Sequence, residues 1–172
     1  DSLAGIVDNQ YENITLYDYA VSFAEEQPPQ SIDRYLTDLG WQAEDGLLVH
    51  SGSADVYAEN LTKTGYLVVP AGDSLEGFVS LHDLQGNPIA MPKTGEVVLS
   101  NSLARDLDLQ VGEKLHLRSE NLGAVEVTLS AVCENYIGSY VYLSPQTYYD
   151  QLGRLPEYKT LYVMAHPGAD PF

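Results

Sequence analysis

The sequence predicts an α+β fold, with mixed β-sheets and three or four short helices. Alternating apolar residues fill most segments that are rich in β-branched and aromatic residues, which is typical of half-buried strands. Helical spacing of apolar residues is confined to a few short stretches. Hydrophobic residues make up 44% of the 172 positions, enough for a globular core.

The N-terminal third is predicted to be β-α-β. Pro28 and Pro29 break the first strand, Ser31 is expected to cap the following helix, and Gly40 is expected to end it. The expected elements are a short helix over 1–11, a strand over 14–23, a helix over 31–39, and a strand pair or one bulged strand over 47–58.

The remainder alternates strands with two short helices. Ser100 is expected to cap a helix that buries Leu103, Ala104 and Leu107. Ser144 and Pro145 are expected to begin a second helix, which Gly153 ends. The strands expected here cover 66–69, 77–81, 95–99, 111–117, 124–132, 140–143 and 161–165.

The charge of the chain excludes several classes of partner. Twenty-five acidic and eight basic residues give a net charge of −17, which repels phosphate backbones and anionic lipid headgroups. We therefore expect no nucleic-acid partner. No apolar run approaches the roughly 18 residues of a membrane span. The chain starts at Asp1 and not at a methionine, so we expect a piece of a longer protein.

No catalytic, cofactor or metal motif is found in the sequence. The histidines at 50, 82, 116 and 166 are not at ligand spacing, and Cys133 is expected to be a buried, inert thiol. We therefore predict that the chain is not an enzyme and holds no cofactor. A hydrolase would require one of these histidines to meet a carboxylate and a hydroxyl in a pocket.

Thirteen tyrosines are the one unusual excess in the composition. Tyrosine suits interfaces that are apolar in body and hydrated at the rim. The alternative is that these residues are half-buried beneath the domain's own second layer. The candidate partner-contact residues are Tyr136, Tyr140, Tyr142 and Tyr148, with Tyr149 beside them.

Two segments resemble a known family. Residues 95–117 read GEVVLSNSLARDLDLQVGEKLHL, and residues 133–148 read CENYIGSYVYLSPQTY. Both resemble stretches of FtsX-like, MacB-type ABC transporter permeases, and the second resembles the large permeases of Gram-positive bacteria. The strand predicted from residue 14 resembles the one that follows a membrane helix in that family. One departure is Glu113, where the family usually has aspartate.

The resemblance implies a MacB-periplasmic-core-like domain of two lobes. A porter-like lobe would contain 1–60 and 157–172, and an inserted α/β lobe would contain 61–156. Acidic residues outnumber basic ones more strongly in 1–60 than in 61–172, which agrees with this division. The family continues with another helix and strand after the strand at 161–165, so the porter-like lobe is expected to be incomplete in this chain.

The function implied is that of a non-catalytic extracytoplasmic domain at the cell membrane. It would couple ATP hydrolysis by a separate cytoplasmic ABC ATPase, through its own transmembrane helices, to substrate handling or signalling outside the cytoplasm (mechanotransmission). The substrate would be a peptide, lipid or antibiotic. The alternative is a secreted or lipid-anchored binding module for a peptide or glycan.

Overall fold

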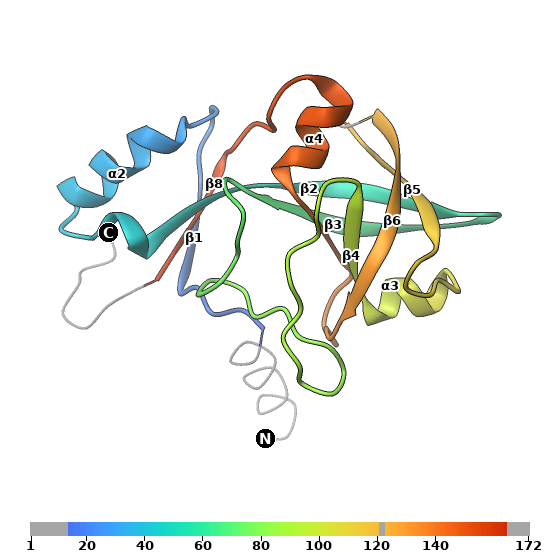
Figure 1. The fold of residues 1–172 in the computed structure, drawn as a ribbon. Coiled ribbons are helices and arrows are strands. Elements are labelled where there is room, and N and C mark those ends of the chain that lie inside the picture. Colours follow the sequence, from blue (N-terminus) through green and yellow to red (C-terminus); the bar gives the residue numbers. More distant parts are fainter. Residues whose placement is uncertain (1–13, 121–122, 165–172) are drawn as a thin grey trace.

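A computed structural model describes residues 14–120 and 123–164 of the chain (Figure 1). The helix expected over 1–11 lies outside the described residues. The elements are β1 (Tyr19–Ser22), α2 (Pro29–Asp38), the 3₁₀ turn η1 (Ala43–Asp45), β2 (Gly46–Ala58), β3 (Leu61–Pro70), β4 (Glu96–Ser100), α3 (Asn101–Asp106), β5 (Lys114–Ser119), β6 (Gly123–Cys133), β7 (Tyr140–Leu143), α4 (Pro145–Leu152) and β8 (Thr160–Val163). This large sheet with a few short helices confirms the predicted α+β class.

Six strands close into a barrel in the order β2-β3-β7-β4-β6-β5, with β5 pairing back onto β2. Alternate residues of these strands point inward and form one buried cluster, which includes Val56, Leu67 and Leu129. Leu103 from α3 and Tyr148 from α4 join the same cluster. Figure 1 shows α4 and α3 on opposite sides of the barrel strands.

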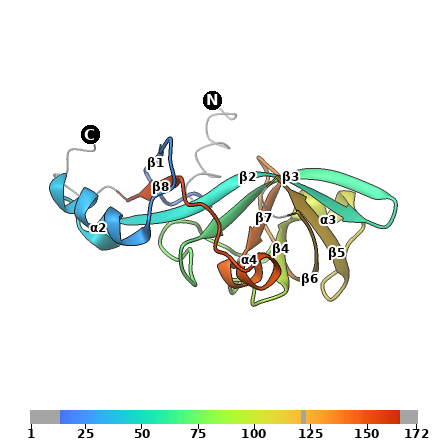
Figure 2. The same cartoon turned by 90° about the horizontal axis from the view of Figure 1, so that it is seen from above.

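A second sheet region extends from the barrel because β2 is shared. Gly46–Val49 of β2 pairs with β8, whereas Val49–Ala58 pairs with β3. β8 pairs in turn with β1, and α2 packs beside this region through Ile32 and Leu36. Viewed from above, α2, β1 and β8 lie at the end of β2 that is farther from the barrel (Figure 2).

The predicted lobe boundary at residue 60 lies in the turn between β2 and β3, which pair over ten residues. The first predicted lobe therefore contributes one strand, β2, to the barrel. The residue bounds of the two lobes stay a prediction.

Residues 77–81 do not form the predicted strand. Phe78 and Val79 are buried against the outer face of the barrel, so their apolar character reflects packing and not a strand ladder. Val79 forms only an isolated bridge with Thr15. Nearly all of the stretch between β3 and β4 forms an irregular cover over this face, the covering segment (residues 71–94).

The other elements follow the predictions with small shifts. The strand expected over 14–23 is reduced to β1, and residues 47–58 form one continuous strand. Ser31 is not the cap of α2, because that helix begins at Pro29 and the Ser31 hydroxyl donates to the Pro28 carbonyl at 2.8 Å. Ser144 does cap α4, accepting from Thr147 N–H, and Gly153 ends it at φ +72°. In the described part of the chain, no helix has the length and apolar character needed to cross a membrane.

Candidate contact surface

The four candidate contact tyrosines do not share one surface. Tyr136 is 70% exposed, Tyr140 is partly buried, and Tyr142 and Tyr148 are only 3% and 0% exposed. Tyr148 fills the barrel core, and Tyr142 lies under the covering segment. Tyr142 and Tyr148 are core residues in this structure, and both are more deeply buried than the half-buried positions of the alternative interpretation. Tyr136 is the accessible member.

Burial changes the chemistry of the two inner tyrosines. Burial raises the pKa of Tyr142 well above its ordinary value, and it also raises the pKa of Tyr148. The hydroxyl of Tyr148 has no hydrogen-bond partner among the described residues. Both phenols are therefore neutral at physiological pH, and both act as large apolar side chains.

Tyr136 lies on a loop that joins β6 to β7 and that side-chain hydrogen bonds hold in place. The buried Asn135 side chain accepts from the N–H groups of Ile137 and Gly138, both at 3.0 Å. The Asn135 N–H donates to Asn101 Oδ1 at 3.0 Å, which ties the loop to the start of α3. Ile137 is exposed beside Tyr136. The loop thus presents two neighbouring large side chains from a fixed backbone.

A chain of polar contacts anchors this loop to the covering segment. The Tyr136 hydroxyl donates to Glu134 Oε2 at 3.1 Å, and this contact raises the pKa of Tyr136. Glu134 Oε1 lies 3.2 Å from His82 Nε2, and His82 Nδ1 lies 3.2 Å from Ser80 Oγ. The Glu134 N–H also donates to the His82 carbonyl at 2.9 Å. Glu134 therefore connects the Tyr136 hydroxyl to His82 of the covering segment.

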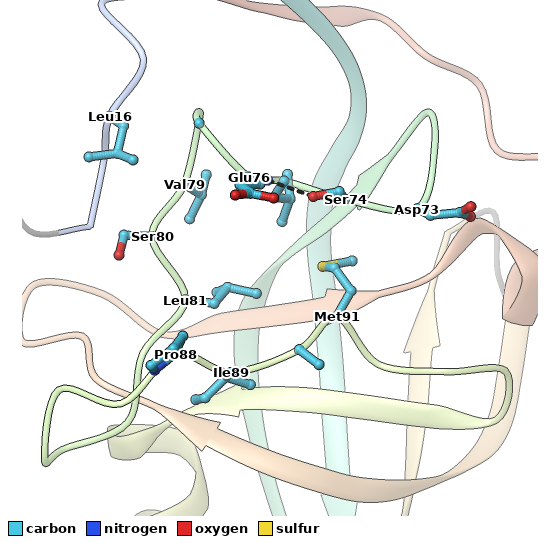
Figure 3. Close-up of a pocket in the computed structure, with 13 residues that line it drawn as sticks. Leu16, Asp73, Ser74, Glu76, Val79, Ser80, Leu81, Pro88, Ile89 and Met91 are labelled. Atoms are coloured by element: carbon cyan, nitrogen blue, oxygen red, sulfur yellow. Dashed lines mark hydrogen bonds between the residues drawn. The ribbon is translucent and has the colours of Figure 1, made fainter.

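The covering segment and Leu16 line an open cavity of about 460 Å³, and Ser80 is among its lining residues. Figure 3 shows the side chains of Leu81, Ile89 and Met91 along one side of it and those of Glu76 and Val79 along the other. A volume of this order is within the usual range of small-molecule sites. The cavity and the Tyr136 loop meet through Ser80 and His82.

The contacts of His82 are those that a hydrolase would require, because this histidine meets both a hydroxyl (Ser80) and a carboxylate (Glu134). Their connectivity resembles a catalytic triad, in which one imidazole nitrogen faces a hydroxyl and the other a carboxylate. However, Ser80 lies on the irregular covering segment and not on a sharp strand-to-helix turn, and its own N–H donates to the Ile14 carbonyl at 2.8 Å. Because this N–H already donates to a backbone carbonyl, it is not free to stabilise a reacting oxygen as part of an oxyanion hole. The arrangement accounts for positioning of the Tyr136 loop.

Other titratable side chains have structural partners. Cys133 is buried, and burial raises its pKa to about 12, as expected of an inert thiol. His50 contacts the Glu157 carbonyl at 3.0 Å, and burial lowers its pKa. His116 lies 3.6 Å from Glu126 on the barrel surface, and His166 lies outside the described residues. Within 14–120 and 123–164, no three histidine, cysteine or acidic side chains gather as a metal site.

Sequence reasoning missed the contacts around His82 because they join distant segments. His82 and Glu134 are 52 residues apart, and no spacing rule connects them. The only signal was that Glu134 and Tyr136 stand together in the second family-like segment.

Comparison with known proteins identifies the fold. No protein-family model and no curated protein matches the sequence. The structure is similar to the extracellular domain of the noncanonic ABC-type transporter YknZ from Gram-positive bacteria, with a TM-score of 0.57, 12% identity, and coverage of 87% of this chain and 83% of that one. It is also similar to the periplasmic region of MacB from Actinobacillus actinomycetemcomitans, with a TM-score of 0.55, 12% identity, and coverage of 88% and 75%. The chain therefore has the fold of these MacB-like ABC transporter domains, which confirms at the level of fold the resemblance carried by its two sequence segments.

Proposed function

We propose that this chain is a non-catalytic extracytoplasmic domain of an FtsX/MacB-type ABC transporter permease from a Gram-positive bacterium. The observation that carries the proposal is the similarity of fold to two transporter domains over 87% and 88% of the chain. The family-like segments at 95–117 and 133–148 agree with it. The partners would be the permease's own transmembrane helices and a separate cytoplasmic ABC ATPase.

The domain would relay ATP-driven movement to substrate handling or signalling outside the cytoplasm. The shared strand supports this role, because β2 is 13 residues long and belongs both to the barrel and to the β1-β8 region. A displacement of either region would therefore be transmitted to the other through β2, which is hydrogen-bonded to both. The substrate would be a peptide, lipid or antibiotic. We also propose the lobe division at 1–60 with 157–172, and at 61–156, as the organisation of the domain, with β2 of the first lobe built into the barrel.

Tyr136 is proposed as the contact residue for a partner or substrate. It is exposed, its loop is fixed by Asn135, and its hydroxyl is oriented by Glu134. Interface hot spots are enriched in tyrosine, and truncating a hot-spot side chain to alanine reduces the binding affinity about tenfold or more. We expect Tyr136→Ala in the full-length protein to lower transport or resistance without changing the stability of the domain.

The matched control for Tyr136→Ala is Leu61→Ala, which removes an exposed apolar side chain near the β2–β3 turn. Transport or resistance is measured for both variants, and a thermal unfolding curve is recorded for each purified domain. Equal activity of the two variants would contradict the contact role of Tyr136. It would not contradict the transporter assignment.

The transporter assignment itself is tested on the parent gene. An apolar stretch of about 20 codons shortly before residue 1, with further spans after residue 172, is the expected result. Co-purification of an ABC ATPase with the full-length product would then identify the partner. A signal peptide or lipobox before residue 1 and a stop codon soon after residue 172 would overturn the assignment. A secreted or lipid-anchored module for a peptide or glycan would then be the better reading.

A further inference from the structure

A second hollow lies away from the Tyr136 loop, where α2, α4 and the end of β3 approach one another. This groove has a volume of about 470 Å³ and is lined by Pro29, Ala71, Pro145, Tyr149, Leu155 and Tyr158 among others. Tyr149 and Leu155 are 56% and 54% exposed although both are large and apolar. Tyr158 is buried, so its ring lies on the protein side of the groove. Apolar walls of this kind gain free energy when a ligand covers them.

The charges around the groove are acidic. Asp150 lines it, and no basic side chain is among the described residues that do so. Asp73 lies just beyond the lining residue Gln146 and accepts from its Nε2 at 3.1 Å. Glu26 lies near the Tyr158 hydroxyl, and burial together with this carboxylate raises the pKa of Tyr158 to about 12. Arg154 precedes Leu155 in the chain but does not line the groove.

Two helix N-termini also reach this groove, at Pro29 of α2 and Pro145 of α4. Each carries about half a positive charge, and at α4 the Ser144 cap already takes one of the free N–H groups. The full charge of Asp150 and the net charge of −17 outweigh these dipoles. The electrostatic preference of the groove is therefore for a cation.

We propose that this groove binds an amphipathic organic cation, whose apolar body packs between Tyr149 and Leu155 and whose ammonium group pairs with Asp150. Tyrosine faces also attract ammonium groups, which favours the same ligand class. The site lies apart from the Tyr136 loop and shares no lining residue with the cavity beside Ser80, although Asp73 of that cavity contacts the groove's lining residue Gln146. It does not depend on the transporter assignment, because it rests only on the groove of this chain.

The test titrates the 172-residue chain with three probes of equal chain length: n-octylamine, n-octanol and octanoate. Binding is followed by the amide shifts of the ¹⁵N-labelled protein. We expect the shifts to map to groove residues such as Ala71, Thr94 and Gln146, and we expect affinity to fall in the order amine, alcohol, carboxylate. A single exposed ion pair contributes up to about a fivefold difference in affinity.

Two variants and a control assign the binding to named side chains. Asp150→Asn should lower the affinity for the amine about fivefold and leave the alcohol unchanged. Leu155→Ser should weaken both probes roughly fivefold through lost apolar contact. Asp38→Asn removes an equal charge at the far end of α2 and should change neither. Amide spectra of the unliganded variants confirm that each remains folded.

Three results would overturn the proposal. The first is octanoate binding at the groove as tightly as the amine. The second is amine-induced shifts that map to the Ser80 cavity or scatter over the acidic surface. The third is a set of groove shifts that depends on protein concentration without any probe, which would assign the groove to a second copy of the chain. None of these results bears on the transporter assignment, which the parent gene tests.

Discussion

The barrel interior and the covering segment are both built on the same strands, yet different interactions hold them. The interior is a single apolar cluster in which alternate strand residues meet, with Leu103 and Tyr148 closing it. The covering segment lies on the outer face and combines a second apolar cluster with side-chain hydrogen bonds around His82 and Glu134. Periodic apolar packing thus stabilises one region, whereas individually placed polar contacts position the other.

The largest effect is expected from a cavity in the barrel interior. Leu129→Ala removes a fully buried side chain that the closed strands cannot collapse onto, so it should lower the free energy of unfolding by about 3 kcal/mol. Leu84→Ala is the control, because Leu84 is half exposed on the covering segment and should cost less than about 0.5 kcal/mol. Urea denaturation measures both. Equal losses would show that the barrel interior is no more tightly packed than its cover.

A smaller effect should come from adding one methyl group inside the barrel. At Gly65 of β3, a Cβ atom would lie 2.9 Å from Leu103 Cδ1 and 3.0 Å from Val141 Cγ2. Gly65→Ala should therefore cost about 2 kcal/mol through overpacking. Gly52→Ala, on the paired strand β2, meets nothing within 4 Å and should be neutral or slightly stabilising. A stable Gly65→Ala variant would mean that α3 can shift away from the barrel.

The polar contacts of the outer region are tested at Asn135. Asn135→Ala leaves the N–H groups of Ile137 and Gly138 without their acceptor, at a cost of about 1–2 kcal/mol. Because the loss is local, hydrogen exchange of these two amides should accelerate while amides of β6 remain protected. Uniform acceleration across β6 and β7 would show that the loop is part of the barrel's cooperative unit.

The smallest effect concerns His50, which is on the barrel strand β2. Burial holds the pKa of His50 below its ordinary 6.5, so the unfolded chain binds the proton more tightly than the folded chain does. Stability should therefore be lost as the pH falls from 6.5 toward the folded-state pKa. His50→Gln keeps a donor for the Glu157 carbonyl and should remove this part of the pH dependence. Urea midpoints of the parent chain and of His50→Gln, recorded above and below pH 6.5, test this prediction. The same pH dependence in both proteins would contradict it.

The same difference explains what the sequence could predict. Alternating segments such as 124–132 were found because the barrel buries every second residue, and Ser144 with Gly153 marked α4 correctly. Residues 77–81 have a similar apolar pattern, but Phe78 and Val79 pack without a strand partner on each side. A window of sequence contains no information about that difference. The strand prediction failed there for this reason.

The contact role of the candidate tyrosines stays a prediction, and the structure separates these residues only by their exposure. The tyrosine excess led to Tyr136, but composition could not separate it from Tyr142 and Tyr148, which the fold buries. Contacts between His82 and Glu134 depend on how the covering segment crosses the sheet. They needed the three-dimensional structure.

The closure of the barrel also bears on aggregation. Among the described strands, β1 alone has a single neighbouring strand, although parts of the longer strands, such as residues 61–65 of β3, also pair on one side only. An unpaired strand edge is a template for pairing with another molecule, and short strands limit that hazard. β1 has four residues and the one-sided stretch of β3 has five, so the edges that this chain offers to foreign strands are short. Together with the high negative charge of the chain, these short edges should keep the folded chain monodisperse at high concentration.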